Sequence, residues 1–393
     1  MTHTVPDLPW LSGQMTDLDE LREARSRSWV GRSDRGLEVL TYDEGFQVLE
    51  HPELLKGPSW TRRLDELGVD GEARRYYDMA VPATEGAYRK KLRAPLGALF
   101  RPSRVAKLRE AVRRIARDAV EEIEPASSVD LMAQLCRVVP PRVYCELVSM
   151  PYELAPEVAR ISDVTLGALL TVDHSRKQEA MDAMLAAVEL VREHLEARRN
   201  NLGDDFTSVM IRQQMDGMLT EDELFAEALS ILQASVDNTM HEMGNVFGML
   251  LTQPQRWQDF LGDRELCGSI IDEVIRLYPR FGTIFRYAPG EVVINDQVVP
   301  ADSWVFVSVR AGQRDPQVFT EPDEYRLDRP TKRALMFGAG TYNCLGQGLA
   351  RLEIEEALRA VADRYPGLSL TDPWLRRDTN AVTETTQLQV SLG

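Results

Sequence analysis

One cysteine lies in a glycine-rich segment whose composition suits a flat ligand. The segment reads Phe337-Gly-Ala-Gly-Thr-Tyr-Asn-Cys344-Leu-Gly346, and a helix is predicted to start near Gly346. Glycine lets a backbone approach a ligand closely, and amides at a helix N-terminus stabilise a thiolate. The pattern therefore indicates a stabilised thiolate at Cys344. The alternative is a buried structural cysteine, because free cysteine is usually buried.

A second candidate for chemistry lies on a long helix. The capping box Thr220-Glu-Asp-Glu223 starts this helix, and no proline interrupts it before about residue 252. Ala234, Ser235 and Asn238 share one face at i, i+3 and i, i+4 spacing. They form a small, polar stripe on which a ligand could rest.

The elements that must position these groups are mostly helical. Residues 36–50 read as a strand and then a helix. Residues 88–123 read as helices with a break at Pro102, and residues 128–215 read as mostly helical with prolines between the helices. Residues 57–87 read as a long, partly ordered loop. Further segments are helices at about 264–277 and 346–364, β-structure within 281–310 and a C-terminal hairpin strand. The fold class is mainly α with a minor β-sheet region, and residues 1–393 form a single domain.

Composition narrows the function classes. Lys and Arg number 46 against 62 Asp and Glu, and a net charge of −16 argues against nucleic acid or an anionic membrane as the main partner. The 4 cysteines contain no CxxC pair and suggest a reducing cytoplasm. The first 14 residues lack the pattern of a signal peptide, and the uncharged run at 228–236 is too short to cross a bilayer. We expect a soluble cytoplasmic protein.

The motifs together resemble the cytochrome P450 superfamily, of the soluble bacterial type. F-x-x-G-x-x-x-C-x-G with the following L-A-R is similar to its haem-ligand loop, and Glu273-Val-Ile-Arg276 is similar to its E-x-x-R motif. The segment from Arg314 to Pro322, followed by Arg329, resembles the meander that precedes the loop. The resemblance covers essentially the whole chain. It implies a triangular-prism helical body with heme b between the long central helix and the cysteine loop.

The resemblance also implies roles for these residues. Cys344 would be the axial iron ligand, and Glu273, Arg276 and Arg329 would form a buried triad. For Glu273 and Arg276, the alternative is an ordinary solvated ion pair. Further cofactor contacts would be Phe337, Gly338, Gly346 and Ala234.

Binding of the haem propionates departs from the family pattern at two positions. Arg286 and Arg93 match the usual propionate arginines. Arg89 stands where the family usually has histidine, and Tyr342 stands where it usually has histidine or arginine. The alternative for Arg89 is a solvated helix face.

The long helix departs from the family's A-G-x-[DE]-T pattern at the oxygen side of the haem. Asp237 matches the acid, but Ser235 replaces the glycine and Asn238 replaces the threonine, with Thr239 next to it. An amide is not a useful acid, so three proton routes remain. Asn238 orders a water that relays protons from Asp237, the substrate supplies a hydroxyl, or Thr239 acts through a distorted turn. The alternative is that Asp237 faces away and pairs with a base.

The implied activity is that of a haem-thiolate monooxygenase, an oxidoreductase of the EC 1.14 type. It would use O₂ and two electrons from a ferredoxin and ferredoxin reductase to hydroxylate a small organic substrate, possibly a natural product, and would act as a monomer. Asn238 favours an alternative, which is oxidative coupling, ring closure or O-dealkylation of an aromatic substrate. Peroxide-driven turnover and a non-catalytic haem sensor are further alternatives. Ligation of haem by His241 is a rival interpretation that no surrounding pattern supports.

The expected substrate contacts are Phe281, Thr283, Ile284 and Ser235, with segment 57–87 and residues 382–383 nearby.

Overall fold

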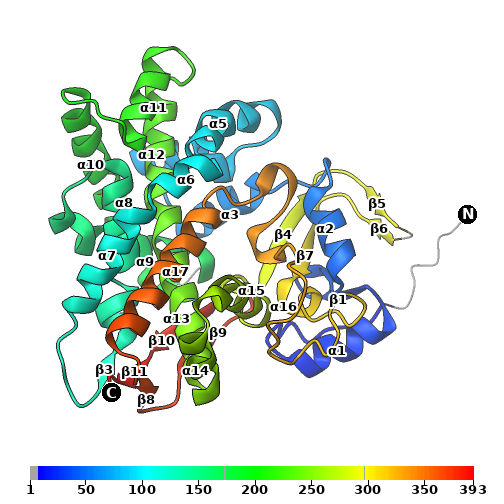
Figure 1. Cartoon of the computed structure of the whole chain (residues 1–393). Helices are drawn as coiled ribbons and strands as arrows, with labels where there is room; N and C mark the ends of the chain where they lie inside the picture. Colours follow the sequence, from blue (N-terminus) through cyan, green and yellow to red (C-terminus); the bar gives the residue numbers. More distant parts are fainter. Residues whose placement is uncertain (1–7, 172–173, 296) are drawn as a thin grey trace, which may run out of the picture. The chain divides into compact units, whose positions relative to one another are not determined.

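The computed structural model describes residues 8–171, 174–295 and 297–393 (Figure 1). It divides into two compact units. The first unit comprises residues 1–59, 269–344 and 377–384, and the second comprises 60–268, 345–376 and 385–393. Much of the opening segment, on which the expectation of no signal peptide rests, lies outside the described residues. Within them, no helix combines the length and the apolar character that crossing a membrane requires.

The first unit is built on a four-stranded sheet in the order β1-β2-β7-β4. Strand β2 runs parallel to β7, and the other two pairs are antiparallel. Gly36 opens β2 with φ +146°, and a Cβ there would lie 2.3 Å from the Trp304 carbonyl oxygen. Glycine is therefore required where the two strands approach. The elements of this sheet and its hairpin are β1 (Val30–Ser33), β2 (Gly36–Val39), β4 (Thr283–Ala288), β5 (Val292–Ile294), β6 (Gln297–Val299) and β7 (Ser303–Ser308).

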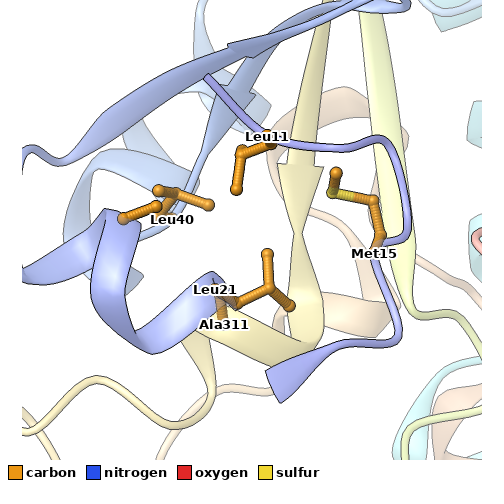
Figure 2. Close-up of a cluster of buried hydrophobic side chains, with 6 residues drawn as sticks. Leu11, Met15, Leu21, Leu40 and Ala311 are labelled. Carbon is orange, nitrogen blue, oxygen red and sulfur yellow. The ribbon is translucent and has the colours of Figure 1, made fainter. Parts of the chain in front are cut away.

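Three helices of the first unit are α1 (Leu18–Arg27), α2 (Tyr42–Glu50) and the short α16 (Val309–Gly312). A cluster of buried apolar side chains joins the N-terminal segment, α1 and α16 (Figure 2). Leu11, Met15, Leu21 and Leu40 are each at most 1% exposed. Burial of such side chains stabilises a fold by about 1.5–3 kcal/mol each, so this cluster anchors the N-terminal segment to α16.

The second unit is mainly helical. Helix α12 packs against α4, α9, α10 and α11, and α13 packs against α8, α9, α14 and α17. One small sheet of this unit has the strand order β3-β11-β8. The helices are α4 (Gly71–Met79), α5 (Gly86–Leu99), α6 (Pro102–Lys107), α7 (Arg109–Glu121), α8 (Val139–Val148), α9 (Ala155–Thr171), α10 (Lys177–Arg199), α11 (Phe206–Met215), α12 (Glu221–Ser235), α13 (Asp237–Leu251), α14 (Pro254–Gly262) and α17 (Gln347–Arg364). Helices α3 (Gly57–Leu67) and α15 (Cys267–Leu277) have residues in both units. The strands of the second unit are β3 (Val129–Asp130), β8 (Ser369–Leu370) and β11 (Gln389–Ser391). The paired strands β9 (Leu375–Asp378) and β10 (Thr383–Gln387) have residues in both units.

The predicted fold class is confirmed, but the predicted loop at 57–87 is wrong. This segment forms α3, α4 and the start of α5. Leu64, Leu67 and Tyr77 are each at most 1% exposed. Leu64 and Leu67 share a face of α3 at i, i+3 spacing, and Tyr77 lies on α4. Glycine and proline mark the ends of these helices and not a continuous loop.

The long helix begins at the predicted capping box, since Thr220 and Glu223 each satisfy the other's backbone amide. It is interrupted at Val236, whose φ of −108° and ψ of −67° separate α12 from α13. The expected single helix is therefore two helices that meet beside Ser235 and Asp237.

Candidate active site

The cysteine loop is held by its own backbone. The Cys344 amide donates to the Phe337 carbonyl oxygen at 2.7 Å. Between them, Gly338 has φ +69°, and a Cβ there would lie 3.0 Å from the Tyr342 carbonyl oxygen. A side chain at position 338 would strain this turn. The glycines therefore close a tight loop with the Cys344 side chain at its end.

Cys344 differs from the other three cysteines in its exposure. Its side chain is exposed, whereas Cys136, Cys145 and Cys267 are buried. Burial raises the pKa of Cys145 and of Cys267 to about 12 and raises that of Cys136 further. The alternative that Cys344 is a buried structural cysteine is therefore wrong. Of the four cysteines, Cys344 is the exposed one.

Arg286 lies beside this loop within the first unit. It is 0% exposed, and its guanidinium carbon lies 4.6 Å from the centre of the Tyr342 ring. Its Nη2 donates to the Leu49 carbonyl oxygen and its Nη1 to that of Phe285, both at 3.0 Å. The ring and the carbonyls hold a buried cation next to the cysteine loop.

The structure brings Glu273, Arg276 and Arg329 together. Arg276 donates from Nε and Nη2 to the two Glu273 carboxylate oxygens at 2.7 and 2.8 Å. Arg329 Nε donates to the same carboxylate at 3.1 Å. The Glu273 and Arg276 side chains are 4% and 6% exposed, so the alternative of a solvated ion pair is wrong. Arg276 also donates to the Gln313 carbonyl oxygen, which ties α15 to the segment that follows α16.

The helices α12 and α13 carry one accessible stripe. Every residue from 223 to 251 is buried except Ser230, Ala234, Ser235 and Asn238. Ser230, Ala234 and Asn238 follow one another at spacings of four, and Ser235 precedes Asn238 by three, which are the spacings of residues on one helical face. Three of them form the predicted stripe. The same spacing from Ala234 back to Ser230 is a signal that the sequence reasoning overlooked.

Asn238 offers an unused hydrogen-bonding atom on this stripe. Its Oδ1 is buried and has no hydrogen-bond partner in the structure, although its side chain as a whole is partly exposed. A buried carbonyl oxygen without a partner costs roughly 1–3 kcal/mol. A water or a ligand donor beside Asn238 would remove that cost.

Asp237 points away from the stripe, as the alternative interpretation stated. Its side chain is 1% exposed and lies 3.4 Å from His241 Nε2. His241 Nδ1 lies 3.2 Å from the Thr385 carbonyl oxygen, so both ring nitrogens have protein partners and the rival role of His241 as a haem ligand is wrong. Thr239 is 6% exposed, and the distorted turn does not bring it onto the stripe.

Arg89 and Arg93 lie on α5. Arg93 is half-buried. Arg89 is 3% exposed and donates to the Val81 carbonyl oxygen, so the solvated helix face is wrong. The Val81 amide in turn donates to Glu227 Oε1 at 3.1 Å. Glu227, which the sequence did not single out, thus shares a buried network with Arg89.

Glu227 is expected to make stability depend on pH. Burial raises its pKa from 4.5 to about 8. Between these values the folded protein binds more protons than the unfolded chain, so its free energy of unfolding falls as pH rises. Glu227→Gln cannot titrate. It should therefore gain stability over the parent between pH 5 and pH 8, by at most about 1.4 kcal/mol per pH unit.

Denaturant unfolding at pH 5 and pH 8 measures this difference. Glu196→Gln, on the exposed side of α10, is the control and should follow the parent at both values. Parallel pH profiles for Glu227→Gln and the parent would contradict the expectation.

The expected substrate contacts divide into two groups. Phe281, Ile284 and Ser235 are partly exposed and stay candidates. Thr283 is 3% exposed, and its hydroxyl donates to the Asn380 carbonyl oxygen at 2.8 Å, so its role as a substrate contact stays a prediction that its burial does not favour. Val382 is 0% exposed and forms a bridge to Phe281.

The residues described above fit a haem. The donor set contains one exposed cysteine sulfur, which is the ligand of a haem-thiolate iron. Arg286 supplies a buried cation of the kind that binds carboxylates. The small side chains of Ala234 and Ser235 leave an accessible strip on otherwise buried helices.

Comparisons with known proteins agree with this fit. Residues 256–390 match the family model of cytochrome P450. The chain is 31% identical to 6-deoxyerythronolide B hydroxylase of Saccharopolyspora erythraea, over 77% of this chain and 75% of that one. It is 30% identical to mycinamicin IV hydroxylase/epoxidase of Micromonospora griseorubida, over 92% of this chain and 90% of that one. The fold is similar to epothilone D-bound cytochrome P450epoK, with a TM-score of 0.88, 20% identity and coverage of 96% of each chain. The chain therefore belongs to the cytochrome P450 family, and it is a haem-dependent monooxygenase that uses O₂, a redox partner and a small-molecule substrate.

Proposed function

We propose that this enzyme inserts one oxygen atom from O₂ into a small natural product, most simply as a hydroxyl group. The accessible stripe at Ser235 and Asn238 carries this proposal, because it gives a substrate polar contacts on an otherwise buried helix pair. Two relatives are named for 6-deoxyerythronolide B and mycinamicin IV and are called hydroxylases. These names favour oxygen insertion over the coupling, ring closure or dealkylation that Asn238 suggested.

The Cys344 thiolate would hold the haem iron. Bound haem supplies the activation of O₂ with two electrons. Arg286, with Tyr342 against its guanidinium, and Arg93 would bind the propionates. Arg89 would contribute from the network that it shares with Val81 and Glu227. Contacts with the flat faces of the ring would come from Phe337, Gly338, Gly346 and Ala234.

Asn238 would place the proton donor. Asp237 is engaged by His241, and Thr239 is buried, so neither presents an oxygen on the stripe. The unpartnered Asn238 Oδ1 accepts a hydrogen bond from a water or from a substrate hydroxyl. That hydroxyl, and not an acid of the protein, would then deliver the proton.

Replacing Asn238 by threonine is expected to change the fraction of electrons that end in product severalfold. Threonine presents a rotatable hydroxyl in place of an amide, and this alters which donor is held on the stripe. The measurement is NADPH consumed per product formed with a reconstituted ferredoxin system. Asn201→Thr, at an exposed position, is the control, and equal coupling in all three proteins would contradict the role of Asn238.

Product masses test the reaction itself. Turnover under ¹⁸O₂ should give a product heavier by one ¹⁸O atom. A product lighter by two hydrogens or by an alkyl group would contradict oxygen insertion. Substrates are first found by the spectral change that accompanies displacement of water from the ferric enzyme. Turnover with hydrogen peroxide and no ferredoxin would instead support the peroxide-driven alternative.

We propose a ferredoxin and its reductase as the electron source. Lys332 and Arg333 are exposed shortly before the cysteine loop and would contribute to a positive patch for an acidic donor. The four free cysteines favour a reducing cytoplasm. We also propose a monomer and a single P450 catalytic domain over residues 1–393, as the resemblance to the family implies.

A further inference from the structure

The break between α12 and α13 has an unusual hydrogen-bonding arrangement. In a continuous helix, the Asp237 amide would donate to the Gln233 carbonyl oxygen, four residues earlier. Here the Asp237 amide donates to the Ser162 hydroxyl at 3.4 Å. The same hydroxyl donates to the Gln233 carbonyl oxygen at 3.2 Å. Ser162 therefore stands between the two backbone groups that would otherwise bond to each other.

Ser162 belongs to a different helix, α9, and is 0% exposed. Thr165, one turn later on α9, is also 0% exposed, but its hydroxyl donates to the Ile161 carbonyl oxygen of its own helix at 2.7 Å. Hydroxyls of buried helical residues usually bond to their own helix in this way. The Ser162 hydroxyl instead donates to α12 and accepts from α13. Insertion of a side chain into the hydrogen-bond ladder is a recognised cause of a kink.

A second contact joins α9 to the same junction. Ligand atoms of Asp163, Asp237 and His241 all lie within 4.8 Å of one another, and Arg137 Nη1 lies 3.2 Å from Asp163. This charged cluster holds the first turn of α13 against α9. The Ser162 hydroxyl and the charged cluster therefore act at adjacent positions of α9.

The break divides the accessible stripe. Ser230, Ala234 and Ser235 belong to α12, and Asn238 belongs to α13. A change in the angle or rotation at Val236 would move Asn238 relative to Ala234 and Ser235. The break therefore determines how the two parts of the stripe face a ligand.

We propose that Ser162 is a positioning residue that keeps the α12–α13 ladder open and thereby sets the place of Asn238. The proposal rests on the role proposed above for the stripe. Without the hydroxyl, the Asp237 amide and the Gln233 carbonyl oxygen would satisfy each other directly, because a buried backbone group left unpaired is costly. The two helices would then become more nearly continuous.

Amide hydrogen exchange of the holoenzyme tests this without any turnover. Ser162→Ala is expected to slow exchange at the Asp237 amide by about fivefold or more, since a direct backbone bond replaces a long bond to a hydroxyl. Thr165→Val is the matched control, because it removes a buried hydroxyl from the same helix and keeps the volume of the side chain. Ser162→Thr, which keeps a hydroxyl, should retain the exchange rate of the parent.

Imidazole binding, read from the shift of the Soret band, gives a second readout. We expect its Kd to change by about threefold or more in Ser162→Ala and to stay at the parent value in Thr165→Val. Unchanged or faster exchange at Asp237 in Ser162→Ala would overturn the proposal. Slower exchange with an unchanged imidazole Kd would overturn the link to Asn238. If the enzyme does not insert oxygen into its substrate, the product masses will show it. The hydrogen-exchange rates at Asp237 and the imidazole Kd values would still follow the expectations above.

Discussion

Cys344→Ser is expected to abolish the strongly red-shifted Soret absorption that carbon monoxide gives with a reduced haem-thiolate protein. A serine side chain stays protonated near neutral pH and lacks the thiolate sulfur on which this absorption depends. We expect turnover to fall by more than about 100-fold, because even loss of a residue that only supports a metal ligand costs about 10–100-fold. The measurements are the spectrum of the reduced, carbon monoxide-treated protein and the rate of product formation.

Cys267→Ser is the matched control for this experiment. Cys267 is buried at the start of α15, and the same change of sulfur to oxygen there should leave the spectrum unaltered. A Cys344→Ser protein that keeps the parent spectrum would contradict ligation by Cys344. So would a parent protein that binds no haem after correct assembly.

Glu273→Gln is expected to destabilise the protein by about 3–5 kcal/mol, because it leaves buried arginines without a carboxylate. Arg276 donates twice to Glu273, and Arg329 donates once. A neutral amide cannot accept all three bonds with the same charge assistance. Denaturant unfolding, followed by helical circular dichroism and by haem release, measures the loss.

The chain offers a closely matched control for Glu273. Glu157 and Arg160 have the same i, i+3 spacing and two hydrogen bonds, at 2.7 and 2.8 Å, but their side chains are 43% and 48% exposed. Glu157→Gln should cost no more than about 1 kcal/mol, since water solvates both charges once the pair is broken. Equal losses of unfolding free energy in Glu273→Gln and Glu157→Gln would show that burial of the Glu273 triad adds nothing to stability.

Much of this enzyme could be predicted from residue order alone. The cysteine loop, the E-x-x-R pair and the capping box at Thr220 are local patterns, and local patterns specify local hydrogen bonds and turns. The spacing of Ala234, Ser235 and Asn238 likewise placed them on one face, and the structure leaves that face accessible. The segment 57–87 was misread because its glycines and prolines mark helix ends, while the buried tyrosine and leucine faces carry the helical signal.

Contacts between segments distant in the chain were decided only by tertiary structure. No sequence pattern around Ser162 predicts that its hydroxyl lies between the Gln233 carbonyl oxygen and the Asp237 amide. The partner of Asp237 and the pKa of Glu227 depend in the same way on which elements pack beside them. Spacing along one helix fixes which side chains share a face. Burial, hydrogen-bond partners and charge arise only where separate helices meet, and these determine what that face can do.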